Sequence, residues 1–167
     1  MSSLQMIVKQ HQVRAAQFAP ESFDWNKRKA KWLASLRQLI DQLRQWLMDA
    51  GVPGEEIIAT RHSISEEGLG DYEAPGLEVK IGRLLVTFVP VASNVIGGVG
   101  RVDVTGPRGE VKLIADTVQP VVDGEPDPSC DDREWLWLAY PDRSRRGGFP
   151  LDENGLAKVL EVVLGDA

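Results

Sequence analysis

A histidine and several carboxylates lie close together between residues 62 and 73, and such groups can hold a metal ion or move protons. His62, Glu66 and Asp71 are the three side chains that would form a metal site there. Imidazole and carboxylate groups are common metal ligands, and a pair of them can act in general acid–base catalysis. A catalytic zinc site needs three well-placed protein ligands, often with more than one histidine. The pattern therefore favours a solvated acidic loop over residues 65–76, with a metal site as the alternative.

A second catalytic set begins in the same stretch. Asp71 is followed by Glu78 and Lys80 on a short alternating segment, and this order resembles the core of the PD-(D/E)xK nucleases. The resemblance implies a metal-dependent hydrolase in which the two carboxylates hold magnesium and the lysine positions the attacking water. The match is confined to residues 71–80, and a strand follows where that family places a helix. A Glu-x-Lys step on an exposed strand also arises from solubility alone, so this chemistry is the alternative prediction.

Glycines cluster between residues 97 and 109, where they could form a phosphate-binding loop. Such a loop leads directly into a helix N-terminus, whose free N–H groups hold the anion. Here residues 101–105 alternate as a strand, a turn follows at 106–109, and residues 110–116 alternate again. The glycines therefore predict bends between strands, and no cofactor is expected.

Four residues are candidates for a binding surface. Arg101 and Asp103 project from the polar side of one predicted strand, and Trp135 and Trp137 share one side of another. Arginine and aromatic side chains commonly anchor interfaces. The tryptophans would join the arginine only if both pairs reach the same face of the sheet. They can equally pack under the helices, and the sequence leaves their face open.

Two helices and about six strands must position these residues. An apolar stripe predicts a long helix over residues 24–50, with Ser22 or Asp24 as its cap and Gly51 at its end. Residues 151–165 predict a second amphipathic helix. Strands are predicted at residues 56–64, 77–81, 84–91, 101–105, 110–116 and 134–140.

The fold class that follows is α+β, an antiparallel meander with both helices packed on one face of the sheet. Residues 1–20 predict a flexible N-terminal arm or a short edge strand, and residues 21–167 predict a single domain. Residues 27–31 place four cations in the first two turns of the long helix, where they oppose the helix dipole. An anionic neighbour is the simplest expectation for them.

The composition excludes several function classes. A net charge of −6 argues against general nucleic-acid binding, which needs a dominant basic surface. The chain has no apolar run long enough for a signal peptide or a membrane span, so the cytoplasm is the expected compartment. The single cysteine, Cys130, lies among acidic residues that would raise a thiol pKa and weaken its reactivity.

These observations favour a non-enzymatic protein-binding module, of the adaptor, immunity-protein or secretion-chaperone kind. It would use the open face of its sheet or the exposed side of the long helix. The alternative is the metal-dependent hydrolase or nuclease built on Asp71, Glu78 and Lys80. A small-molecule pocket lined by tryptophans also stays open, and the broad stripe of the long helix makes a homodimer a further prediction.

Overall fold

The computed structural model describes residues 3–17, 24–93, 99–117, 134–141 and 147–165, with the side chains of α1 described for residues 3–11. Cys130 and the basic residues Arg143, Arg145 and Arg146 lie outside this part of the chain. The elements are α1 Ser3–Gln17, α2 Trp25–Asp49, the short 3-10 turn η1 Gly54–Glu56, β1 Ile57–Glu66, β2 Gly70–Ile81, β3 Leu84–Ala92, β4 Gly100–Gly106, β5 Gly109–Thr117, β6 Trp135–Tyr140, β7 Phe149–Pro150 and α3 Glu153–Leu164.

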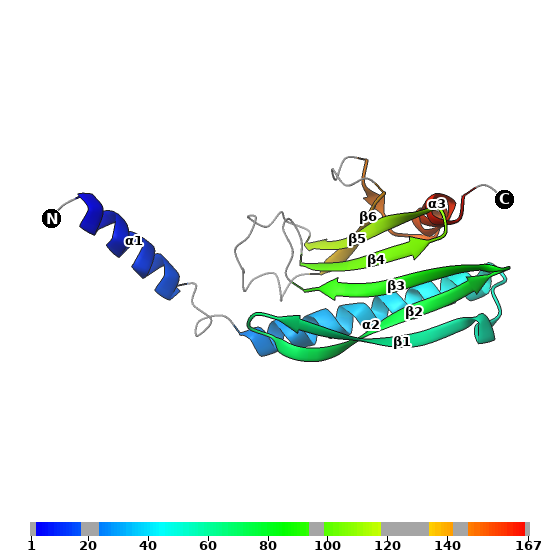
Figure 1. Ribbon diagram of the computed structural model, residues 1–167, viewed down its shortest axis with the longest axis horizontal. Helices are drawn as coiled ribbons and strands as arrows, with labels where there is room; N and C mark the ends of the chain where they lie inside the picture. The colour runs from blue at the N-terminus through cyan, green and yellow to red at the C-terminus, as the bar shows by residue number, and fades with distance from the viewer. Residues whose placement is uncertain (1–2, 18–23, 94–98, 118–133, 142–146, 166–167) are drawn as a thin grey trace.

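The strands form one antiparallel sheet in which each strand pairs with the next along the chain, from β1 to β7. Figure 1 shows α2 running behind the sheet along β1–β3, and α3 at one end of β4 and β5. The predicted α+β class and meander are confirmed. Among the described strands, the sequence missed only β7, a two-residue strand that pairs with Leu138 and Ala139 of β6.

Helix α2 begins where the sequence predicts, because Asp24 caps it. The Asp24 carboxylate accepts a hydrogen bond from the backbone N–H of Lys27 at 3.0 Å. The helix stops before Gly51, whose φ of +106° suits the left-handed turn that ends many helices. Trp32, Leu36 and Leu43 are fully buried on its sheet-facing side. The cap, the stop and the apolar stripe are local signals, and all three are present in the structure.

Two glycines of β4 show that both helices cover the same face of the sheet. A Cβ atom added to Gly100 would lie 2.5 Å from the ring of Trp32 on α2, and one added to Gly106 would lie 2.5 Å from the backbone oxygen of Val163 on α3. The two glycines are an even number of residues apart, so they point to the same side of the strand. Gly100 and Gly106 therefore let both helices approach the sheet, and β5 rather than a helix follows the turn at 106–109.

The predicted acidic loop at residues 65–76 is wrong, because this stretch is a β-hairpin. Strand β1 continues to Glu66, the turn occupies residues 67–69, and β2 starts at Gly70. Ile64 pairs with Tyr72 and His62 with Ala74, and the inward side chains of Tyr72 and Ala74 are buried. Pro75 and the nearby glycines suggest a loop in the sequence, but the alternation of buried side chains decides the structure.

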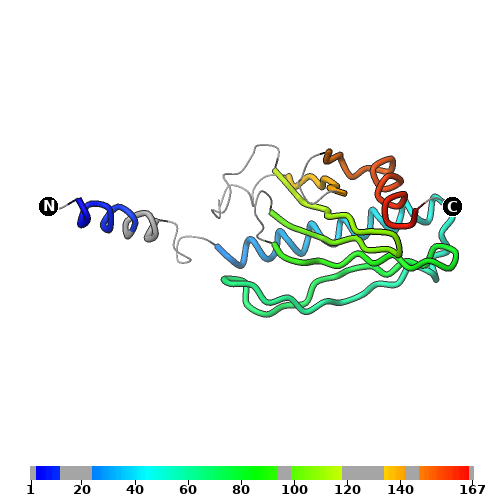
Figure 2. The backbone as a smooth tube through the Cα atoms, turned by 45° about the horizontal axis from the view of Figure 1, so that its top comes forward, coloured from blue at the N-terminus to red at the C-terminus, as the bar shows by residue number. Residues whose placement is uncertain are grey.

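Residues 3–17 form the helix α1 rather than an edge strand. Its described side chains, at residues 3–11, are all exposed. Figures 1 and 2 show α1 beyond the end of the sheet, on the side where α2 begins. No helix in the described ranges is both long and apolar enough to cross a membrane.

Candidate functional site

An aromatic cluster fills the end of the core where α2 begins. Trp32 is fully buried, and its indole ring lies 6.5 Å from the ring of Trp135 and 6.2 Å from that of Trp137, measured between centroids. The Trp32 N–H donates a hydrogen bond of 2.9 Å to the hydroxyl of Tyr72. One side chain of α2 thus joins β6 on one side to β2 on the other, across the middle of the sheet.

The Tyr72 hydroxyl in turn donates a hydrogen bond to the carboxylate of Glu66. The same carboxylate accepts the backbone N–H of Ser93 at 2.9 Å, so it ties the β1–β2 hairpin to the end of β3. Burial, together with the hydrogen bond to Glu66, raises the pKa of Tyr72 above its ordinary value. A phenol with a raised pKa keeps its proton at neutral pH, so the Tyr72 hydroxyl makes structural hydrogen bonds and does not act as a base.

The protonated Tyr72 hydroxyl predicts that the free energy of unfolding falls at alkaline pH. An unfolded tyrosine ionises near pH 10, whereas Tyr72 in the folded chain holds its proton to higher pH, so its contribution is complete below pH ~10 and is lost as the pH rises further. Between pH 10 and 12 this single group should lower the free energy of unfolding by up to ~1.4 kcal/mol per pH unit. Tyr72→Phe should be less stable at pH 7 but should decline less steeply. Urea titrations across this range measure both slopes, and parallel slopes for the two proteins would contradict the assignment.

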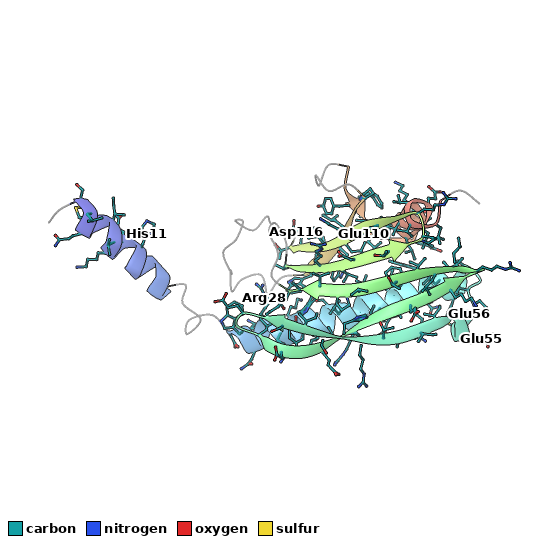
Figure 3. The ribbon with its side chains drawn as sticks, in the orientation of Figure 1. His11, Arg28, Glu55, Glu56, Glu110 and Asp116 are labelled. Atoms are coloured by element: carbon teal, nitrogen blue, oxygen red, sulfur yellow. The ribbon has the colours of Figure 1, made fainter. Side chains whose placement is uncertain are left out.

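The aromatic rings also explain the basic cluster at residues 27–31. The Lys29 ammonium lies 5.3 Å from the centroid of the Tyr72 ring. The Arg28 guanidinium and the Lys31 ammonium each lie 5.9 Å from the Trp135 ring. Arg28 is buried, and Figure 3 labels it at the start of α2. The electron-rich faces of these rings attract cations and offset the unfavourable helix dipole.

A groove opens beside this cluster, between α2 and β6, with a volume of about 540 Å³. Trp135 and Leu39 are buried in it, Trp46, Trp137 and Leu151 are half-buried, and exposed polar side chains of α2 form the rim. The described residues that line the groove are Ser35, Gln38, Leu39, Asp41, Gln42, Gln45, Trp46, Trp135, Leu136, Trp137 and Leu151. The groove therefore has an apolar, largely aromatic floor and a rim of three glutamines and one aspartate.

The α2 side of the groove follows from helical spacing. Ser35, Leu39, Gln42 and Trp46 recur at steps of three and four, so they form one stripe along α2. This stripe adjoins the fully buried stripe that faces the sheet. In the sequence, the only sign of the groove was three glutamines next to an apolar stripe on α2. Helix α2 and strand β6 lie about ninety residues apart in the chain. The spacing of residues along α2 cannot show that the two elements lie side by side in the fold.

No protein-family model, curated protein or solved structure matches this chain. The geometry of the groove therefore carries the functional argument.

The four predicted binding residues do not share a surface. Trp135 and Trp137 face α2 and line the groove. Arg101 and Asp103 alternate with the fully buried Val102, so they lie on the opposite face of the sheet. A joint surface of arginine and tryptophan, which the sequence left open, is not formed.

On that opposite face, Arg101 and Asp103 pair with each other. Two hydrogen bonds, of 2.7 and 3.0 Å, join the guanidinium to the carboxylate. This pairing raises the pKa of Arg101, which therefore stays charged. The two groups neutralise each other, so the pair offers a partner less net charge than the sequence suggests.

The predicted catalytic and metal residues are also spread out. Asp71 and Glu78 lie seven residues apart on β2, roughly 23 Å at ~3.3 Å per residue, and Lys80 lies further still from Asp71. Asp71 also points away from its neighbour Tyr72, whose hydroxyl contacts Glu66.

The His62 ring instead contacts the hydroxyl of Thr60, at 2.8 Å. Within the described ranges, no three histidine, cysteine or acidic side chains lie close enough to hold a metal ion. The structure therefore brings together neither the set Asp71, Glu78 and Lys80 nor the set His62, Glu66 and Asp71.

Proposed function

We propose that this protein is a non-enzymatic binding module that accepts an apolar helical segment of a partner protein in the groove between α2 and β6. The observation that carries this proposal is the groove itself, about 540 Å³ in volume, with Trp135 and Trp137 in its floor. Tryptophan is enriched among the residues that dominate binding energy at interfaces. A concave apolar floor with a polar rim is the usual anatomy of such a site.

The shape of the groove favours a helix as the occupant. It follows α2 from Ser35 to Trp46, a length of roughly 16 Å at ~1.5 Å per residue, which corresponds to about three helical turns. The side chains of α2 that face the groove repeat at three and four residues and form a ridge, against which a second helix can pack. Helix-in-groove recognition uses anchors with the same spacing.

The chemistry of the rim indicates the kind of helix that fits. Gln38, Gln42 and Gln45 can both donate and accept hydrogen bonds, so they tolerate polar flanks of either kind. Asp41 is the only charged residue in the part of the lining that the structure describes, so this rim favours a helix with basic flanks.

A peptide-display selection against the full chain tests the proposal. Selected peptides should carry apolar residues at steps of three and four, and they should lose at least about tenfold in affinity when Gln42→Arg places a long cationic side chain in the groove. Gln42 is exposed on α2, so this substitution should leave the fold intact. Tryptophan fluorescence measures binding directly, because Trp46 and Trp137 line the groove.

Ala157→Arg is the matched control. It adds the same charge at an exposed position of α3 that does not line the groove. Peptides that bind the wild type and both variants equally well would refute the groove as the binding site.

A further inference from the structure

Helix α1 presents an exposed apolar stripe, and Figures 1 and 2 show this helix apart from the sheet. Leu4, Ile7 and Val8 are spaced as neighbours on one side of the helix, with exposures of 71%, 53% and 46%. Met6 points to the opposite side of the helix. Figure 3 labels His11, one turn further along the same stripe, and shows it well apart from the sheet. An exposed apolar stripe on a helix is a surface that gains free energy when a partner covers it.

The groove and α1 match in length. Helix α1 has 15 residues, about 22 Å at ~1.5 Å per residue, so it covers the roughly 16 Å of the groove along α2. Its stripe would present Leu4, Ile7 and Val8 to the floor that contains Trp135 and Trp137.

They also match in charge. The segment of residues 3–17 contains Lys9 and Arg14 and no acidic residue, although the whole chain has a net charge of −6. Among the described residues, the groove lining contains Asp41 and no cation. The cations of α1 and the carboxylate of Asp41 attract each other, which favours the encounter.

We infer that the groove between α2 and β6 binds helix α1 of a second copy of this chain, so that two copies exchange their N-terminal helices. This inference rests on the proposed function, because it names an occupant for the same groove. A second copy fits better than the chain's own α1, since α1 extends beyond the end of the sheet, away from the groove of its own chain (Figures 1 and 2). Exchange between identical chains fills both grooves at once and gives a closed, symmetric dimer.

Sedimentation of the full chain tests this inference. The wild type should sediment with twice the mass of one chain. Ile7→Glu places a charge in the apolar stripe of α1, and Gln42→Arg obstructs the groove, so each should raise the dimer dissociation constant by at least about tenfold. Met6→Glu is the control for α1, because it adds the same charge to the opposite side of that helix. Ala157→Arg is the control for the groove, and both controls should remain dimeric.

Mixing the two disabling variants shows whether α1 binds the groove of a second copy or the groove of its own chain. The Gln42→Arg chain keeps an intact α1, and the Ile7→Glu chain keeps an intact groove, so an equimolar mixture should form heterodimers joined by one contact. If α1 instead folds into the groove of its own chain, the wild type and the mixture stay monomeric, and the inference is overturned. A dimer that resists both Ile7→Glu and Gln42→Arg also overturns it.

The two proposals can fail separately. If the wild type is monomeric but Gln42→Arg still weakens the binding of the selected peptides, the exchange of helices is refuted and the proposed function stands. Selected peptides that are insensitive to Gln42→Arg remove the proposed function, whatever the mass of the chain.

Discussion

Replacing Trp32 with alanine should lower the free energy of unfolding by about 3–5 kcal/mol, the usual cost of emptying the site of a large buried aromatic side chain. Trp32 is fully buried, and it contacts two tryptophans of β6. Its loss also leaves the Tyr72 hydroxyl without the indole N–H that it accepts. Because the cluster spans the sheet from β2 to β6, the cavity cannot close by moving one neighbour. Urea denaturation followed by circular dichroism measures the change.

Trp46→Ala is the matched control for this substitution. Trp46 lies on the same helix but is only half-buried beside the groove, so its removal should cost clearly less than that of Trp32. Trp32→Phe should fall between wild type and Trp32→Ala, because it keeps an aromatic ring and loses the N–H donor. Equal losses for Trp32→Ala and Trp46→Ala would show that the aromatic cluster is not the centre of the core.

The parts of the fold that could be predicted from the sequence are those that depend on neighbouring residues. Asp24 caps α2 as predicted, and the Asp152 carboxylate caps the predicted second helix by accepting the N–H of Gly155 at 2.6 Å. The predicted strands 77–81 and 84–91 leave two residues between them, and Gly82 there has the positive φ, +63°, that a two-residue hairpin turn needs. The loop predicted at residues 65–76 was wrong. Proline and glycine normally mark loops, whereas here pairing with β1 holds these residues in a strand.

The candidate site was harder to predict, because it depends on the face that each side chain of β6 takes. Trp135 and Trp137 alternate with Leu136 and Leu138, so both sides of this strand are apolar and periodicity cannot assign them. In the structure, Trp32 of α2 packs against both Trp135 and Trp137, so these two side chains lie on the face of the sheet that α2 covers. The residues that form the floor of the groove were thus visible in the sequence as candidates, but their surroundings were not.

The basic cluster at the start of α2 illustrates the same dependence on tertiary contacts. The sequence predicts an anionic neighbour for these cations, because they oppose the helix dipole. The described contacts of Lys29 and Lys31 are instead with the faces of Tyr72 and Trp135. A ring face attracts a cation through its quadrupole without carrying a net charge. The composition of the aromatic cluster therefore suits both the burial of its rings and the position of the lysines.

Gly106→Ala should lower the free energy of unfolding by about 1–3 kcal/mol, the usual cost of overpacking a tightly packed contact. The added Cβ would lie 2.5 Å from the backbone oxygen of Val163 and 2.8 Å from its Cβ atom. A backbone atom cannot rotate away as a side chain can, so α3 must move from the sheet. That movement also strains the hydrogen bond from the N–H of Arg108 to the Val163 oxygen, 2.9 Å long. Thermal and urea unfolding measure the loss.

Gly54→Ala separates this steric effect from the general effect of replacing glycine. The nearest atom to a Cβ at Gly54 is the end of the Met48 side chain, at 3.7 Å, which is an ordinary contact. The backbone φ of Gly54 is not positive, so alanine should be tolerated there within about 0.5 kcal/mol. If Gly106→Ala proves as neutral as Gly54→Ala, α3 does not rest directly on β4. The arrangement of both helices on one face of the sheet would then lose the contact that defines it.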